Sequence, residues 1–153
     1  MHLTLWTEYA LRTLIYVGAG GARRATIGEV AACFDVSKTH LMKVVNRLAQ
    51  QGYLETTRGK GGGLRLARAP AEIRVGAVVR ATEDDLAVMG CLGATGFCRI
   101  EGCCVLRQAL RQATEAFLAT LDAYTLADLL APGATLARRL GLAPAATAPP
   151  GTG

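Results

Sequence analysis

Apolar residues recur at intervals of three and four along much of the chain, and this spacing predicts a mainly α-helical protein. Helices are expected over roughly 4–17, 26–33, 37–50, 75–82 and 104–123. The clearest i, i+3, i+4, i+7 pattern lies in the third of these, at Leu41, Val44, Val45 and Leu48. One face of that helix is therefore expected to be buried, and the other to be exposed.

The second and third predicted helices stand in helix-turn-helix order, followed by a hairpin. Thr26 and Glu29 fit a capping box at the start of the second helix, and Ser37 is a good N-cap for the third. Two short strands are expected over 53–56 and 64–66, joined by a turn rich in basic residues and glycine. The fold class predicted from this order is mainly α with a small β wing, a winged helix-turn-helix.

The last predicted helix has an apolar seam close to a heptad repeat, formed by Leu106, Leu110, Ala113, Phe117, Leu121 and Tyr124. Such a seam suits dimerisation with a second copy of the chain, although packing within its own domain stays open. Pro70 marks a boundary, so the predicted organisation is a DNA-binding domain over 1–70 and a cysteine loop with a dimerisation helix over 71–131. Residues 132–153 are expected to form a flexible tail, because they are rich in Ala, Pro and Gly.

Composition narrows the class of protein. The 153 residues are 51% hydrophobic and 19% charged, which allows a buried core and excludes a disordered chain. No charge-free run reaches the roughly 18 apolar residues that a membrane span needs. The first twelve residues lack the basic start and apolar centre of a signal peptide, so a cytoplasmic location is expected.

Charge is unevenly distributed between the two halves. Residues 1–70 hold ten Lys and Arg against four Asp and Glu, whereas residues 71–153 hold seven against eight. A basic first half suggests contact with a polyanion, and its winged helix predicts double-stranded DNA. The residues expected to contact DNA, rather than to form only a solvated face, are Ser37, Lys38, Thr39, His40, Lys43, Arg47, Arg58, Lys60 and Arg65.

Four of the five cysteines fall within fourteen residues, at Cys91, Cys98, Cys103 and Cys104. Cys33 stands apart and is expected to be a small buried residue. A reducing compartment disfavours disulfides, so the cluster points to metal or redox chemistry. Zinc sites usually contain ligand pairs two to four residues apart, which the spacing lacks, and this favours an iron–sulfur cluster. A zinc site, buried unreactive thiols and a regulatory dithiol stay open as alternatives.

The chain resembles the IscR/NsrR/RirA family of winged-helix iron–sulfur regulators over residues 1–131, and within it the nitric-oxide-sensing repressors most. The matching stretches are LTLWTEYALRTLIYV, SKTHLMKVVNRLAQQGYLETTRGKGGGLRLA, IRVGAVVRATED, FCRIEGCCVLRQAL and AFLATLDAYTLADLL. The resemblance implies a homodimer with the cluster at its interface, held by Cys91, Cys98 and Cys104, with Cys103 as a bystander. It also implies a fourth ligand from the partner subunit, a carboxylate whose position corresponds to Glu8. An ion pair between Glu8 and Arg12 is the alternative reading.

Two details bear on the type of cluster and on function. The spacer between Cys91 and Cys98 has six residues where five is more usual, and Arg107 stands where IscR has a histidine ligand. The resemblance therefore favours [4Fe–4S] over [2Fe–2S]. It implies a repressor that leaves a two-fold symmetric operator when nitric oxide attacks the cluster, or alternatively a regulator that senses iron or cluster status. Neither an enzyme nor an electron-transfer protein is expected, because either role leaves the basic winged helix unexplained.

Overall fold

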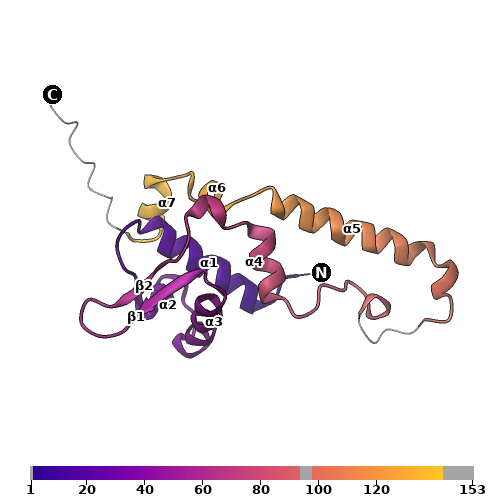
Figure 1. The fold of residues 1–153 in the computed structure, drawn as a ribbon, viewed down its shortest axis with the longest axis horizontal. Helices are drawn as coiled ribbons and strands as arrows, with labels where there is room; N and C mark the ends of the chain where they lie inside the picture. The colour runs from indigo at the N-terminus through magenta and orange to yellow at the C-terminus, as the bar shows by residue number, and fades with distance from the viewer. Residues whose placement is uncertain (1, 94–97, 143–153) are drawn as a thin grey trace, which may run out of the picture.

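Three helices and a two-stranded hairpin form the first half of the molecule, in the order expected of a winged helix (Figure 1). The structure, a computed structural model, describes residues 2–93 and 98–142. The first-half elements are α1 (Leu5–Ala19), α2 (Ile27–Phe34), α3 (Lys38–Gln50), β1 (Leu54–Thr57) and β2 (Gly63–Leu66). The predicted fold class is confirmed, and each of these elements lies within about two residues of its predicted position.

Side-chain caps fix where these helices begin. The Thr4 hydroxyl accepts a hydrogen bond from the Thr7 backbone at the start of α1. Thr26 and Glu29 form the expected capping box on α2, and the Ser37 hydroxyl accepts from the His40 backbone at 3.5 Å at the start of α3. These bonds satisfy backbone donors that an isolated first turn leaves free. The caps therefore set the short turn that presents α3.

The wing is an antiparallel hairpin with Leu54 opposite Leu66 and Thr57 opposite Gly63. Gly63 has a φ of 140°, and a Cβ there would lie 2.7 Å from the Ala25 carbonyl oxygen. Only glycine fits at this position, where Ala25 pairs with Leu64 and attaches the hairpin to the chain before α2. The wing is thereby held against the helices instead of extending freely.

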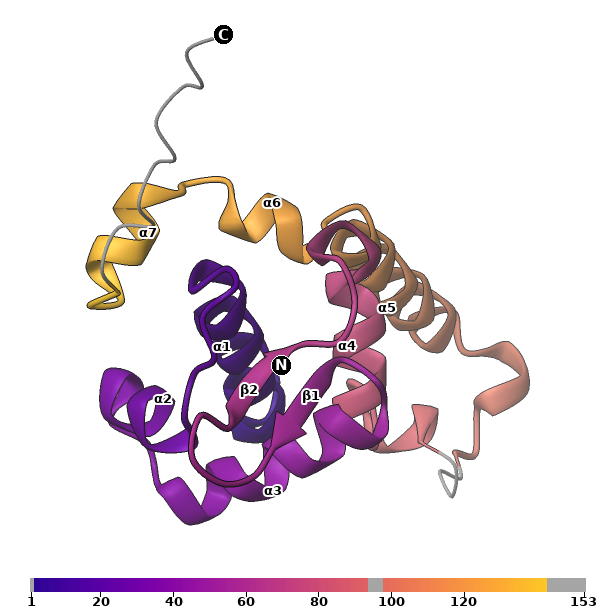
Figure 2. The same ribbon diagram turned by 60° about the vertical axis from the view of Figure 1, so that its left-hand side comes forward.

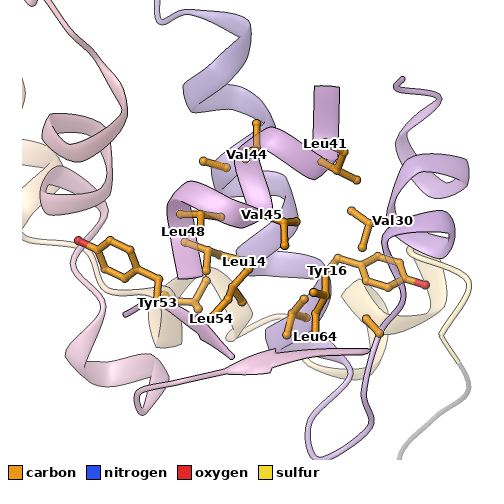
Figure 3. Packing of buried hydrophobic residues seen from close by; sticks show 14 of the residues in the cluster. Leu14, Tyr16, Val30, Leu41, Val44, Val45, Leu48, Tyr53, Leu54 and Leu64 are labelled. Carbon is orange, nitrogen blue, oxygen red and sulfur yellow. The ribbon is translucent and has the colours of Figure 1, made fainter. Parts of the chain in front are cut away.

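The core lies between α1, α2, α3 and the hairpin, as Figure 3 shows from close by. Its fully buried side chains come from the apolar faces predicted by the spacing, and include Leu14, Val30, Leu41, Val44 and Leu48. The ring of Tyr16 meets that of Phe34 edge-on, with centroids 6.3 Å apart. The polar face of α3 is left outside this core.

The second half begins with a short 3-10 turn and ends in helices that return to the first half. Its elements are η1 (Pro70–Glu72), α4 (Val75–Thr82), η2 (Gly90–Leu92), η3 (Glu101–Cys103), α5 (Val105–Asp122), α6 (Leu126–Leu130) and α7 (Ala134–Arg139). α5 projects from the rest of the molecule, with its N-terminal end outermost (Figure 1), and none of its residues is buried. Its C-terminal end is fixed by Asp122, whose carboxylate accepts two hydrogen bonds from Arg80 at 2.7 and 2.6 Å.

The segment after Pro132 differs from the prediction. α7 packs against the first half, and Ala137 and Leu142 are 9% and 6% exposed. Figure 2 shows α6 and α7 crossing one end of α1. The expected flexible tail therefore does not begin at Pro132, because Leu136, Ala137 and Leu140 stand at helical spacing and turn one face of this segment inward. Residues 143–153 lie outside the described part of the chain.

The core also extends past Pro70, the predicted domain boundary. Ile73 and Val78 from the second half, and Leu126 from α6, belong to the same buried cluster as the winged helix. Cys33 was predicted to be buried, but it is exposed, although its thiol donates to the Leu140 carbonyl at 3.6 Å. Partial desolvation there raises the pKa of the Cys33 thiol. Among the described residues, no helix has the length and apolar character that crossing a bilayer requires.

Candidate DNA-binding face and cysteine loop

The N-terminal half of α3 presents a continuous polar surface. Ser37, Lys38, Thr39, His40 and Lys43 are all exposed, because the apolar residues of α3 turn to the opposite side and into the core. Short polar side chains at the start of a helix, followed by cations further along, suit entry into a DNA major groove. The structure thus brings these five predicted residues together on one accessible face.

Arg47 is placed differently from the other predicted DNA contacts. It is half-buried, and its guanidinium lies 3.4 Å from the carboxylate of Asp84 on the segment after α4. Asp84 is 90% exposed, so water screens this ion pair strongly. Arg47 is therefore oriented toward the second half of the chain, and its role in binding DNA stays a prediction.

The wing supplies the other predicted cations. Arg58 and Lys60 are exposed in the turn between the strands, whereas Arg65 pairs across the hairpin with Glu55 at 2.6 Å. Arg24, which the sequence analysis did not select, donates to the Thr57 hydroxyl at 3.0 Å and adds a cation at the base of the wing. Its position follows only from the pairing of Ala25 with Leu64, so no local motif marks it.

The cysteines lie between the end of α4 and the start of α5. Cys91 is in η2, Cys98 precedes η3, and Cys104 is the N-cap of α5, where its sulfur accepts from the Arg107 backbone at 3.4 Å. All three thiols are unpaired and half-buried, whereas Cys103 is exposed and donates to the Ile100 carbonyl. Cys103 thus differs from the other three in its exposure, and the assignment of three ligands and one bystander stays a prediction.

Thiolate donors of this kind suit an iron–sulfur cluster, so the chemistry of the donor set fits. Within residues 2–93 and 98–142 of one chain, however, no three His, Cys, Asp or Glu side chains are grouped closely enough to hold a metal ion. The loop of a single chain therefore presents suitable donors without assembling them.

Glu8 lies in the first turn of α1, far from the cysteines in sequence. Its half-exposed carboxylate forms an ion pair with Arg12, the alternative expected from their i, i+4 spacing. The Arg12 guanidinium also stands 5.4 Å from the centre of the Phe34 ring at the end of α2. Whether Glu8 reaches a cluster of the partner subunit stays a prediction.

Comparison with known proteins identifies the family. The model of the Rrf2 family, described as iron-dependent transcriptional regulators, matches residues 3–132. The HTH-type transcriptional regulator NsrR of Geobacillus kaustophilus is 52% identical over 138 residues, covering 89% of this chain and 94% of that protein. NsrR of Bacillus subtilis is 46% identical over 132 residues, covering 85% and 90%.

Solved structures support the same fold at lower identity. T. potens IscR aligns with a TM-score of 0.69 at 22% identity, over 86% of this chain and 88% of that one. CymR of B. subtilis, described as a global cysteine regulator, aligns with a TM-score of 0.70 at 21% identity, over 86% and 98%. With a family match that spans nearly all of the described helices, the chain belongs to the Rrf2 family of transcriptional regulators.

Proposed function

We propose that the chain works as a homodimeric repressor that binds a two-fold symmetric DNA operator and releases it in response to nitric oxide through an iron–sulfur cluster. The observation that carries this proposal is the position of the thiols. Cys91, Cys98 and Cys104 lie on a segment that joins the winged helix, through α4, to the projecting helix α5. The strong similarity to regulators named NsrR supports it.

DNA binding would use the exposed face of α3 together with the wing. Ser37, Lys38, Thr39 and His40 are positioned to meet base edges, and Lys43, with Arg58 and Lys60 from the wing, to meet phosphates. In a symmetric dimer two such faces would contact half-sites about 34–36 Å apart, one turn of DNA. Affinity should fall steeply as salt is raised, because phosphate contacts release counterions.

Dimerisation would use α5. Val105, Leu106 and Tyr124 are 78%, 56% and 51% exposed, an apolar surface that costs free energy in water. The near-heptad seam gives α5 of a second copy a matching surface to pack against. Pairing there would also bring the cysteine loop of one chain close to its partner.

The cluster, of the [4Fe–4S] type, would be held by the thiolates of Cys91, Cys98 and Cys104 and by Glu8 of the partner subunit. When bound, such a cluster supplies iron that takes up nitric oxide. A carboxylate is a weaker donor to this iron than a thiolate, so Glu8 is the ligand expected to leave first. Release of Glu8 would uncouple α1 from the partner subunit, and the two DNA-binding faces would then lose their spacing.

The test is to purify the full chain without oxygen and measure absorbance, iron, sulfide and operator affinity before and after nitric oxide. The expected result is a brown dimer with about four iron and four sulfide per chain, whose operator affinity collapses on exposure. Substituting Cys104→Ala should remove the cluster, and Cys103→Ala should leave it intact. Full operator affinity after nitric oxide treatment would refute the proposed signal.

A second function of the same class is sensing of iron supply. It is favoured by the description of the matching family as iron-dependent regulators. Operator affinity should then change when an iron chelator is added, even where nitric oxide is too dilute to affect the protein. Separate titrations with chelator and with nitric oxide therefore distinguish the two signals.

A further inference from the structure

The carboxylate of Glu83 fastens the first turn of α1 to the end of α4. One of its oxygens accepts hydrogen bonds from the Thr4 backbone at 2.8 Å, from the Thr4 hydroxyl at 3.0 Å and from the Thr7 hydroxyl. Beneath it, the hydroxyls of Thr7 and Thr82 lie 2.7 Å apart and are almost completely buried. We call these four residues, Thr4, Thr7, Thr82 and Glu83, the clasp.

The clasp is stronger than an ordinary helix cap. Hydrogen bonds to a charged acceptor contribute more than neutral ones, and a negative charge at a helix N-terminus interacts favourably with the helix dipole. Burial acts to raise the pKa of Glu83, but the hydrogen bonds from Thr7 and Thr4 outweigh it, so the pKa lies below its usual value. The carboxylate is thus charged at neutral pH, and α1 is held from outside as well as by its own Thr4 cap.

The position of the clasp connects two parts of the candidate cluster site. On one side, Thr7 is followed directly by Glu8, the carboxylate proposed for the cluster of the partner subunit. On the other side, Thr82 ends α4, and the cysteine-bearing segment starts immediately after Glu83. A displacement of either part must therefore strain or break the hydrogen bonds of the clasp.

We infer that Glu83 is a positioning residue that holds Glu8 where it can reach the partner subunit, and that it links each chain's own cysteine loop to the carboxylate this chain donates. This inference rests on the proposed function and adds its regulation. If the cysteine loop of one chain lost its order, the Glu8 that the same chain contributes to its partner would be held less firmly. The two sites of a dimer would then respond together, and not independently.

A matched control lies next in the chain. Asp84 carries the same charge, but it is 90% exposed, and its contact with Arg47 is a single one at 3.4 Å. Substituting Asp84→Asn changes the net charge as Glu83→Gln does, and the hydrogen bond that it alters goes to Arg47 and not to α1. Glu83→Gln keeps an oxygen acceptor for Thr4 and Thr7, whereas Glu83→Ala removes it.

The first experiment measures the clasp in the full-length protein without a cluster. Amide hydrogen exchange of Thr4, Thr7 and Glu8 should accelerate by about tenfold or more in Glu83→Ala. The Thr4 amide donates directly to Glu83, and the amides of Thr7 and Glu8 donate to Thr4, which Glu83 holds in place. The acceleration should be smaller in Glu83→Gln and absent in Asp84→Asn. Trp6, the only tryptophan, lines the same recess as Glu83, so its fluorescence reports the same opening.

The second experiment asks whether Glu83 acts through Glu8. In anaerobically purified protein, the rate of cluster loss under nitric oxide should rise about tenfold in Glu83→Ala or Glu8→Ala, and the double variant should be no faster than Glu8→Ala alone, as residues acting through one step show. The wild type should lose its two clusters cooperatively, and Glu83→Gln should restore most of the wild-type rate. Should Glu83→Ala fail to fold, Thr7→Val carries the same comparison, because it removes one donor to Glu83 and keeps the size of the side chain.

The possible failures are distinguishable. Additive rates in the double variant, or unchanged amide exchange of Thr4, Thr7 and Glu8 in Glu83→Ala, would overturn the inference while leaving the proposed function in place. Wild-type protein without iron and sulfide would overturn the proposed function, and with it any role of Glu83 toward a cluster.

Discussion

The winged helix and the arm formed by the cysteine loop and α5 are built on opposite principles. In the winged helix, Leu14, Val30 and Leu48 are completely buried, and each helix end is capped. In the arm, α5 buries no residue, and large apolar side chains are exposed at its start and just past its end. The first region buries its apolar side chains within one chain, whereas the second leaves apolar side chains exposed and thiols unpaired.

This difference indicates where the proposed second copy and the proposed cluster would contribute. A self-contained core can present α3 and the wing rigidly, which recognition of DNA requires. A region whose packing depends on a partner is suited to sensing. A small chemical change at such an interface can shift the equilibrium between its paired and unpaired states. The joint between the two is α4, which packs against α1 on one side and meets α5 on the other.

The largest expected effect tests the self-contained region. Leu48→Ala should lower the free energy of unfolding by about 2–5 kcal/mol, since it removes a fully buried side chain and leaves a cavity. Met42→Ala, on the same helix but 47% exposed, should change it by about 0.5 kcal/mol at most. Urea unfolding of both variants provides the measurement, and equal losses would contradict the assignment of the α3 faces.

The next effect tests the arm. Leu106→Glu should convert the proposed dimer into single chains of 16.0 kDa and preserve the circular dichroism of the winged helix, because a charge replaces an exposed apolar side chain. Gln112→Glu introduces the same charge on another face of α5 and serves as the control. Sedimentation equilibrium distinguishes the two, and a Leu106→Glu dimer of wild-type stability would place the interface elsewhere.

A smaller effect tests the presentation of DNA contacts. Lys38→Ala and Arg58→Ala should each weaken binding to a selected operator by about 1–3 kcal/mol without changing stability, since both side chains are exposed. Arg138→Ala, on α7, should leave affinity unchanged. Fluorescence anisotropy at several salt concentrations measures this, and an equal loss in all three variants would mean that only net charge matters.

The smallest effect concerns pH and the capping box on α2. The Thr26 backbone N–H donates to the Glu29 carboxylate and holds its pKa below the ordinary value. The stabilisation is therefore present above pH 4.5 and is lost as pH falls through the folded pKa. Glu29→Gln should cost about 1 kcal/mol or less at pH 7 and less still at pH 3.5, as urea unfolding would show. A cost that grows on acidification would contradict this sign.

Much of the fold could be read from local patterns. The apolar face of α3, the Thr26–Glu29 capping box and the glycines of the wing depend on neighbours a few residues away, so their chemistry is visible in the sequence. The helix over Val75–Thr82 was predicted with the bounds observed. The start of α5 at the last cysteine was likewise predicted, because Cys104 directly precedes an amphipathic run.

The predictions that failed concern contacts between distant segments. The composition of residues 132–153 predicts a flexible tail, but Ala137 and Leu142 are buried in the core cluster of the first half. The first helix was predicted to end at residue 17, but α1 continues to Ala19. A Cβ at Gly18 would lie 2.7 Å from Leu130, so this glycine makes room for α6.

The sequence by itself determined the mainly helical winged fold, the basic face and the set of candidate thiol donors, because each depends on residue type and short spacing. Only the tertiary structure decided that Glu83 caps a helix 79 residues away from it at Thr4, that Arg47 faces Asp84, and that no residue of α5 is buried within its own chain. Such contacts arise from chain topology, and no local period or motif records them. They are also the contacts through which one half of this molecule can influence the other.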